Sequence, residues 1–548
     1  MNQIEQALKI TIQEAVKLVF DMEIDSHQIV IEIPREVSHG DYSSNIAMRL
    51  TKELKRNPRE IAEELKNKMI EDTKLIENIE IAGPGFINFF VRNEQLANVI
   101  SKVLKEGDDY GKSDFGKGLK MNVEFVSANP TGDLHPGHAR GAAIGDSVCR
   151  ILRKAGYDVT SEYYINDAGL QIDNMGKSLQ ARYLQAFGIE ASIPEDGYHG
   201  VDLIEIAEKI KVEEGNKYVE LAKEDSFIYF REYGLREELQ KLKDDLNFFR
   251  VDFNVWSSER NIYERGLVQK AVDTLKQLGV TYEKEGALWL KTTEFDDDKD
   301  RVLVKSNGEY TYLTPDIAYH LDKFERGFEN LVNFLGADHH GYINRLKAAV
   351  QALGHNQDDL EIDIIQMVRM IKDGTEFKLS KRTGKALALK DLLEEAGVDA
   401  IRYFFASRAV DTQMDLDLDL ATKQSNENPV YYAQYAHARM CSILKQGEKF
   451  EKADTFSLLT HQKEMDLLKH INEFSSVISD AAKNRQPHRL CNYIQKLAAY
   501  FHSFYNECKV LDETEIQLSS ERLALVKAIC ITLKNALELI GVTAPEYM

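Results

Sequence analysis

Hydrophobic positions along the chain follow different spacings, and the changes in spacing divide it into segments. In the first 115 residues, apolar side chains recur at helical spacing over Ile4–Phe20 and again around Pro58–Ile70. Two strand-like runs, IVIEIP and IEIAGPGFINFFV, follow these helical stretches. The pattern predicts a small α+β domain over residues 1–115, and the glycine-rich, charged stretch Gly107–Gly118 predicts a linker at its end.

The pattern changes twice more along the rest of the chain. Strand-like and helical stretches alternate over residues 116–375, which predicts a doubly wound parallel sheet of the Rossmann type. A charged helical stretch near residues 194–279 interrupts this alternation and predicts an insertion between two halves of the fold. Residues 376–427 form a connecting region, and residues 428–548 read as helical throughout, which predicts an all-α domain.

Charge is distributed unevenly over the 548 residues. The net charge of −21 argues against a generally nucleic-acid-binding surface. All of this excess lies before Val430, because residues 430–548 hold 14 Lys/Arg and 14 Asp/Glu. There is no run of 18 apolar residues and no basic start typical of a signal peptide, so we expect a cytoplasmic protein without membrane contact.

The cysteines give no sign of a disulfide framework. The five residues are scattered and no two of them form a CxxC pair, which predicts reduced thiols in a cytosolic protein. The spacing also argues against a zinc site built on cysteines, so no metal ligands are predicted. These residues are Cys149, Cys441, Cys491, Cys508 and Cys530.

The run SANPTGDLHPGHAR, Ser127–Arg140, carries the most specific chemistry. A stretch rich in strand formers precedes it, and a helical apolar stripe that ends at Gly156 follows it. His135-Pro136-Gly137-His138 is therefore predicted to begin a helix just after a parallel strand. Free N–H groups and the helix dipole favour phosphate there, and Gly137 lets a base or phosphate approach the backbone.

This run resembles the HIGH signature of class I aminoacyl-tRNA synthetases, and the preceding Ser-Ala-Asn-Pro-Thr-Gly resembles the arginyl-tRNA synthetase family in particular. A second run, Lys378-Leu379-Ser380-Lys381-Arg382, resembles the KMSKS loop of the same class, with Leu for Met and Arg for the last Ser. A mobile lysine-rich loop suits contact with ATP phosphates. Taken alone this run could equally be a solvated loop, but the two signatures occur in the family's order.

The resemblance implies a division of roles in ATP binding. In-line attack of an amino-acid carboxylate on the ATP α-phosphate builds negative charge on the leaving pyrophosphate. We expect His135, His138 and Lys381 to stabilise that charge, with Mg²⁺ shared across the phosphates. The ATP-binding residues expected from the resemblance are Gly137, Asp338, Lys378 and Ser380.

Selectivity for arginine requires carboxylates, because a guanidinium binds them in a planar, bidentate fashion. The segment from Tyr312 to Asp316 resembles the Tyr-x-x-x-Asp element of the family, although arginine often stands there at the position of Pro315. We expect Asp316 and Tyr312 to bind the guanidinium, with Glu124 assisting. Without the resemblance, Asp316 would be read as an ordinary aspartate in a first helical turn.

Further substrate contacts are expected from polar residues near strand ends. Asn129 matches the family residue that holds the amino-acid backbone. In Gly336–His340 a metal site is disfavoured, because adjacent side chains diverge and no third ligand stands at useful spacing. The resemblance implies that Asp338 lies near the ATP ribose and His339 near the amino acid, and His340 is taken as structural.

Contacts with tRNA are expected from both ends of the chain. Residues 1–115 resemble the added N-terminal domain of arginyl-tRNA synthetases, and the segment after Asn428 resembles the start of their anticodon-binding bundle. Lys483, Arg485 and Arg489 form a local basic cluster that could bind tRNA-Arg or be a solvated turn. The resemblance implies a monomeric arginine–tRNA ligase that uses L-arginine, ATP and tRNA-Arg.

Three alternatives remain open. The first is another class I synthetase such as the cysteinyl enzyme, although only Cys149 could supply a thiolate in the catalytic region. The second is a small-molecule nucleotidyltransferase, which would leave most of the chain unexplained. The third is a non-catalytic tRNA-binding relative, which the intact His135, His138 and Lys381 disfavour.

Overall fold

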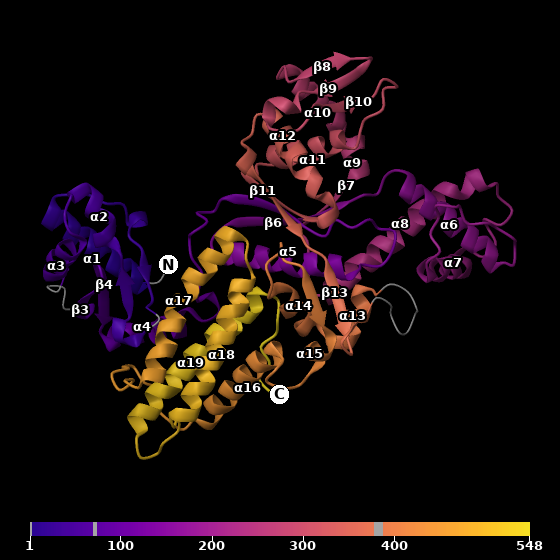
Figure 1. Cartoon of the computed structure of the whole chain (residues 1–548). Coiled ribbons are helices and arrows are strands. Elements are labelled where there is room, and N and C mark those ends of the chain that lie inside the picture. The colour runs from indigo at the N-terminus through magenta and orange to yellow at the C-terminus, as the bar shows by residue number, and fades with distance from the viewer. Residues whose placement is uncertain (1–2, 35, 70–73, 378–386) are drawn as a thin grey trace.

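The computed structural model describes residues 3–34, 36–69, 74–377 and 387–548. The chain forms a small N-terminal domain, a central parallel sheet with two helical or mixed lobes on it, and a C-terminal helical bundle (Figure 1). The bundle lies between the N-terminal domain and the central sheet. Within these described ranges, no helix has the length and apolar content needed to cross a membrane.

The N-terminal domain is an antiparallel sheet covered by helices. Its strand order is β1-β2-β4-β3, and the helix expected over Ile4–Phe20 is present as α1, whose apolar face is buried. The α+β character expected from the pattern is confirmed. The elements are α1 (Gln3–Phe20), β1 (Ile31–Glu32), β2 (Tyr42–Ser44), α2 (Ile46–Leu54), α3 (Pro58–Met69), β3 (Ile76–Ala82), β4 (Phe86–Val91) and α4 (Asn93–Glu106).

The central domain is a five-stranded sheet in which every neighbouring pair is parallel, in the order β12-β11-β5-β6-β7. The Rossmann-type prediction is confirmed. The order runs outward in one direction from β5 and in the other from β11, so a topological switch point lies between these two strands, where ligands bind at the carboxyl ends. The elements are β5 (Lys120–Glu124), α5 (Pro136–Lys154), β6 (Asp158–Ile165), β7 (Val255–Ser258), β11 (Asn330–Gly336), α12 (Ile343–Ala352) and β12 (Leu360–Ile365).

Two lobes extend from this sheet. Three helices between β6 and β7 pack around their own apolar core, and an antiparallel sheet with three helices follows β7. The inserted helices therefore span residues 170–248, whereas the predicted interruption at 194–279 begins too late and includes β7, an edge strand of only four residues. The elements are α6 (Leu170–Ala186), α7 (Val201–Glu214), α8 (Lys223–Phe248), α9 (Glu259–Glu264), α10 (Leu267–Gln277), β8 (Thr281–Lys284), β9 (Ala287–Leu290), β10 (Arg301–Val304) and α11 (Leu313–Glu325).

A small mixed sheet and three helices connect the central domain to the bundle. In the bundle, Asn428 caps α16 by accepting a hydrogen bond from the Val430 N–H at 3.1 Å, and Pro429 occupies the first helical position. The elements are β13 (Val368–Lys372), β14 (Thr375–Glu376), α13 (Leu389–Ala396), α14 (Val398–Ala406), β15 (Met414–Asp417), α15 (Leu418–Thr422), α16 (Pro429–Gln446), α17 (Gln462–Asn484), α18 (His488–Glu507) and α19 (Ile516–Leu539).

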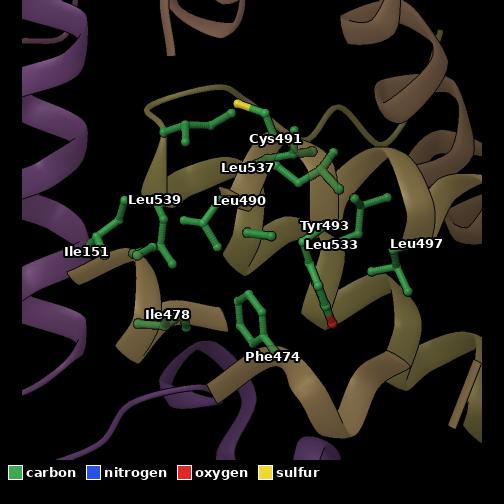
Figure 2. Close-up of a cluster of buried hydrophobic side chains, with 14 of the residues drawn as sticks. Ile151, Phe474, Ile478, Leu490, Cys491, Tyr493, Leu497, Leu533, Leu537 and Leu539 are labelled. Atoms are coloured by element: carbon green, nitrogen blue, oxygen red, sulfur yellow. The ribbon is translucent and has the colours of Figure 1, made fainter. Parts of the chain in front are cut away.

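The bundle shares one apolar core with the central domain. Ile151 of α5 belongs to the same buried cluster as Phe474, Ile478 and Leu539 of the bundle (Figure 2). The predicted linker takes part in this packing, because the buried ring of Tyr110 stacks on Phe474 and its hydroxyl donates to the Ile471 carbonyl at 2.8 Å. Part of the stretch Gly107–Gly118 is therefore packed against the bundle. Its glycine and charge content did not indicate this packing.

Candidate active site

The predicted helix start is formed by the two histidines of the HPGH run. His135 is the N-cap of α5, and its Nδ1 accepts hydrogen bonds from the N–H groups of Gly137 and His138 at 3.1 and 3.3 Å. His138 Nδ1 in turn accepts from the His135 N–H at 3.4 Å, and the two rings stack at 3.6 Å between centroids. Since each Nδ1 is an acceptor, a neutral ring must carry its proton on Nε2.

Desolvation keeps both rings neutral. Burial, with the neighbouring His135, lowers the pKa of His138 to about 4, and desolvation also lowers the pKa of His135. At neutral pH these residues therefore present Nε2–H dipoles to a ligand and carry no full positive charge. This geometry is compatible with the expectation that His135 and His138 stabilise negative charge, but they would do so by donating hydrogen bonds from Nε2.

The loop between β5 and α5 is conformationally strained. Val126 and Ser127 have φ values of +70° and +40°, which residues other than glycine rarely adopt, and the β-branched Val126 least of all. Ser127 Oγ donates to Glu124 Oε1 at 3.0 Å and accepts from the Tyr164 N–H at 3.1 Å, which holds the loop against β6. Strain of this kind accumulates where a site needs a fixed geometry.

A cavity of about 660 Å³ opens at the carboxyl ends of β5 and β11, at the switch point. The structure thus gathers predicted residues that are up to 210 positions apart, from Asn129 to His339, around one space. Asp338 and His339 lie in the short helix after β11, with Asp338 Oδ1 3.0 Å from His339 Nδ1. The predicted site residues that line the cavity are Asn129, His135, Gly137, His138, Asp338 and His339.

The side of the cavity at Tyr164 is acidic. Burial, together with the charges of Glu259, Asp316 and Glu124, raises the pKa of the Tyr164 hydroxyl. Burial raises the pKa of Asp316 to about 6, and burial with the charges of Asp316 and Asp167 raises that of Glu259 to about 7. These carboxylates, called the acidic floor below (Glu124, Asp316 and Glu259), lie behind Tyr164 and do not themselves line the cavity, and their combined charge favours a cation on this side.

Two members of the acidic floor have fixed hydrogen-bond partners. The Tyr342 hydroxyl donates to Asp316 Oδ2, and Glu124 Oε2 lies 2.6 Å from the ammonium of the fully buried Lys323. Glu124 is therefore already paired with a cation, which limits its direct contribution to binding a second one. Asp316 and Glu259 are left as the principal carboxylates for a guanidinium.

The sequence predicts that Tyr312 binds the guanidinium together with Asp316. Its side chain is 93% exposed at the residue that precedes α11, whereas Asp316 lies one turn further along with Tyr342. The structure therefore does not bring Tyr312 against Asp316 in this conformation, and its assignment to the guanidinium stays a prediction. The phenol beside Asp316 belongs to Tyr342, and no pattern in the sequence had indicated it.

Glu259 was also missed. It begins α9 immediately after β7, at the carboxyl edge of the sheet. That position is a signal for a functional carboxylate in a parallel sheet, but it was hidden because β7 was assigned to the insertion. The predicted Lys378, Ser380 and Lys381 lie outside the described residues.

Arg140, the last residue of the motif, joins the site to the segment that leads to the lysine loop. Its buried guanidinium donates at 2.8 Å to the backbone carbonyls of Gln366, Ala409 and Thr412. Gln366 also lines the cavity and precedes β13. The start of α5 is therefore held in register with the connecting region.

The basic cluster of the bundle divides into two parts. Lys483 and Arg489 are exposed. Arg485 is 17% exposed, and its guanidinium contacts two carboxylates of β12, Asp363 at 2.5 Å and Glu361 at 3.1 Å. The prediction that Arg485 binds tRNA is therefore corrected: it joins the bundle to the central sheet, and its charge is already paired.

The fold combines a capped HPGH helix start after the first strand of a parallel sheet with a helical bundle packed on that sheet. This is the arrangement of a class I aminoacyl-tRNA synthetase, and the family model over residues 99–439 shows that class. ATP use follows from that class. Family models match along the chain: "Arginyl tRNA synthetase N terminal domain" over residues 2–91, "tRNA synthetases class I (R), catalytic domain" over 99–439, and "DALR anticodon binding domain" over 433–548.

Similar proteins agree over the full length. The chain is 54% identical to "Arginine--tRNA ligase 1" of Halalkalibacterium halodurans and 54% identical to "Arginine--tRNA ligase" of Anoxybacillus flavithermus, each over 100% of both chains. The solved Thermus thermophilus arginyl-tRNA synthetase shares the fold, with a TM-score of 0.75 at 22% identity over 99% of this chain and 100% of that one. The chain belongs to the arginyl-tRNA synthetase family, and the predicted family and enzyme class are confirmed.

Proposed function

We propose that this protein activates L-arginine with ATP, releasing pyrophosphate, and transfers the arginyl group to the terminal ribose of tRNA-Arg. The observation that carries this proposal is the acidic floor next to the HPGH helix start. A cavity with carboxylates behind Tyr164 on one side and the histidine Nε2–H donors on the other suits a substrate that is cationic at one end and joins an anionic nucleotide at the other.

Arginine binds with its guanidinium at the acidic floor. Asp316 is held by Tyr342, and Glu259 stands beside it with a raised pKa, so a bound cation relieves their mutual repulsion. Asn129 lines the cavity and lies 2.7 Å from Gln171 through its side-chain amide, at a place suited to hold the amino-acid backbone. His339, which also lines the cavity, is proposed to contact the backbone end of arginine.

ATP binds with its phosphates at the start of α5. The Nε2–H groups of His135 and His138, together with the positive end of the α5 dipole, face the developing negative charge. Gly137 permits close approach of the nucleotide, and Asp338 is suited to the ribose hydroxyls. ATP enters as its Mg²⁺ complex, so this ion arrives with the substrate.

The chemical step needs no nucleophilic side chain. An oxygen of the ionised arginine carboxylate attacks the α-phosphorus, and the bond from that phosphorus to the pyrophosphate oxygen breaks. Lys381, with Lys378 and Ser380, is assigned to the leaving pyrophosphate by its resemblance to the KMSKS loop. Arg140 supports this assignment, because it fixes α5 relative to the segment that leads into that loop.

Docking of tRNA-Arg involves the bundle and the N-terminal domain. Lys483 and Arg489 are the exposed cations of the predicted cluster and are proposed to contact backbone phosphates. We also propose that the protein is a monomer and acts in the cytoplasm.

A panel of the twenty amino acids with ATP and total tRNA tests the proposal. Arginyl-tRNA should form and the other nineteen products should stay at background. ATP–pyrophosphate exchange with arginine, measured with and without tRNA-Arg, separates an active ligase from a non-catalytic tRNA-binding relative. Exchange at background under both conditions, with tRNA still bound, would favour that relative.

A further inference from the structure

Three potential metal ligands meet inside the helical bundle, far from the active site along the chain. His437 and Cys530 are buried and Cys441 is half-buried, and one donor atom from each lies within 4.8 Å of the others. Cys530 Sγ is 3.3 Å from His437 Nε2 and 3.7 Å from Cys441 Sγ. His437 and Cys441 stand four residues apart on one face of α16, and Cys530 comes from α19.

The surroundings fix the tautomer of His437. Its Nδ1 is 2.9 Å from the backbone carbonyl of Pro545, which can only accept a hydrogen bond. Nδ1 must therefore carry the proton, and the lone pair of Nε2 faces the thiol of Cys530. A histidine that donates one ring N–H to a carbonyl while the other nitrogen faces sulfur has the arrangement typical of a metal ligand.

We propose that His437 Nε2, Cys441 Sγ and Cys530 Sγ bind a divalent ion of the Zn²⁺ type. Bond lengths of about 2.3 Å to sulfur and 2.0–2.1 Å to nitrogen place tetrahedral ligands about 3.8 Å apart for a sulfur pair and about 3.5 Å for sulfur and nitrogen. The two observed separations, 3.7 and 3.3 Å, lie within about 0.2 Å of these values. Cys441 Sγ also lies 3.8 Å from His437 Nδ1, so Cys441 is the ligand whose position must adjust toward Nε2 for the ion to bind.

Charge and access are also suitable. On binding, each thiol loses its proton to solvent and forms a metal–sulfur bond, so two thiolates balance the dication in a buried place without any change of oxidation state. Cys441 faces a hollow of about 850 Å³ that Glu546 and Tyr547 also line. Water or the exposed carboxylate of Glu546 can therefore reach the fourth position.

The site connects three parts of the chain that the sequence keeps apart. It joins α16 to α19, and through the Pro545 carbonyl it fixes the C-terminal tail on the bundle. The earlier expectation of no metal ligands relied on the spacing of cysteines. That test could not detect a histidine and a cysteine one helical turn apart with a partner almost ninety residues later.

Metal titration of the full-length protein tests the proposal. The chain is stripped with a chelator under a phosphine reductant and titrated with Zn²⁺ against a chromogenic indicator, then with Co²⁺. We expect one equivalent bound, about two protons released, and thiolate-to-cobalt and tetrahedral cobalt absorption bands. Cys441→Ser and Cys530→Ser should each weaken binding by about 100-fold or more.

The controls address folding and oxidation. Cys508→Ser removes a buried thiol of the same bundle outside the cluster and should bind Zn²⁺ like the wild type. Cys441 is half-buried, so its variant should keep the helical circular dichroism of the wild type even if Cys530→Ser does not fold. Failure of the reduced wild type to bind, unchanged binding by Cys441→Ser, or isolation without reductant as a metal-free Cys441–Cys530 disulfide would each overturn the proposal.

Discussion

Replacing Asp316 by asparagine removes one negative charge from the acidic floor while keeping the size of the side chain. Loss of one partner of a desolvated charge pair costs about 2–4 kcal/mol. Each 1.4 kcal/mol is a factor of ten, so the KM for arginine should rise by about 30- to 700-fold. The KM for ATP should change little, because the nucleotide binds at the start of α5.

Aminoacylation of tRNA-Arg at saturating ATP and tRNA is the assay. Glu325→Gln is a matched control, because Glu325 is on the same helix but pairs with Lys270 on the outside of the lobe. This control should leave the KM for arginine unchanged. A wild-type arginine KM in Asp316→Asn would refute the assignment of the guanidinium to this helix.

The pH dependence gives a second, independent readout of the same group. Burial places the pKa of Asp316 at about 6 in the free protein, well above the usual range for aspartate. Arginine requires the ionised carboxylate, so binding releases protons and affinity must rise with pH through this region and fall below it. One pH unit below the pKa, about nine tenths of the carboxyls are protonated and arginine affinity should drop by about tenfold.

Tyr342→Phe should shift this profile in a defined direction. The Tyr342 hydroxyl donates to Asp316 and favours its ionised form, so its removal should move the loss of affinity to higher pH. Glu259, with a pKa of about 7, titrates nearby, and Glu259→Gln separates its contribution. A profile that is identical in the wild type and Tyr342→Phe would mean that this hydrogen bond does not tune the site.

Further variants test the other parts of the site. His138→Ala or Lys381→Ala should slow adenylate formation by about 10²–10³-fold with little change in arginine affinity; with a pKa of about 4, His138 should add no pH dependence to the reaction between pH 5.5 and 8. Lys483→Ala with Arg489→Ala should raise the KM for tRNA and reduce the log–log salt slope by about 0.7–0.9 per lost phosphate contact, and an unchanged slope would make this cluster a solvated turn. Arg485→Ala should lower the free energy of unfolding by about 1–3 kcal/mol, because it leaves Asp363 and Glu361 unpaired in a partly buried contact between the bundle and the sheet. The measurement is the melting temperature, which should fall, while the salt slope of tRNA binding should stay as in the wild type.

Sequence patterns predicted the features that depend on residues close together in the chain. The HPGH turn could be placed at the start of a helix after a parallel strand because the cap, the proline and the apolar stripe all lie within thirty residues. The helical bundle and the parallel sheet were predictable for the same reason. The charge state of the histidines was not, because their neutrality depends on burial that only the folded cavity creates.

Long-range contacts decided what the sequence could not predict. Arg485 appeared to belong to an RNA-binding cluster until the fold placed it against Asp363, 122 residues earlier in the chain. Glu259 was hidden because β7 is a four-residue strand at a sheet edge, too short to show a period of its own. In both cases the role of the residue depends on neighbours that are distant in the chain, and no spacing along the sequence identifies those neighbours.

The two ends of the cavity explain how both substrates can be oriented before any loop closes over them. In the proposed arrangement, the acidic floor repels the phosphates of ATP, so the nucleotide is directed to the start of α5, where the Nε2–H donors of His135 and His138 lie. In the same proposal, the floor attracts the guanidinium of arginine, which turns the α-carboxylate away from Asp316 and Glu259 and toward the nucleotide. Burial is the main cause of the raised pKa values of those two residues, with the charge of Glu124 adding to it at Asp316 and the charge of Asp316 adding to it at Glu259. In this proposal a bound guanidinium favours the ionised forms of both carboxylates, and the reacting carboxylate is held on the side of the α-phosphate.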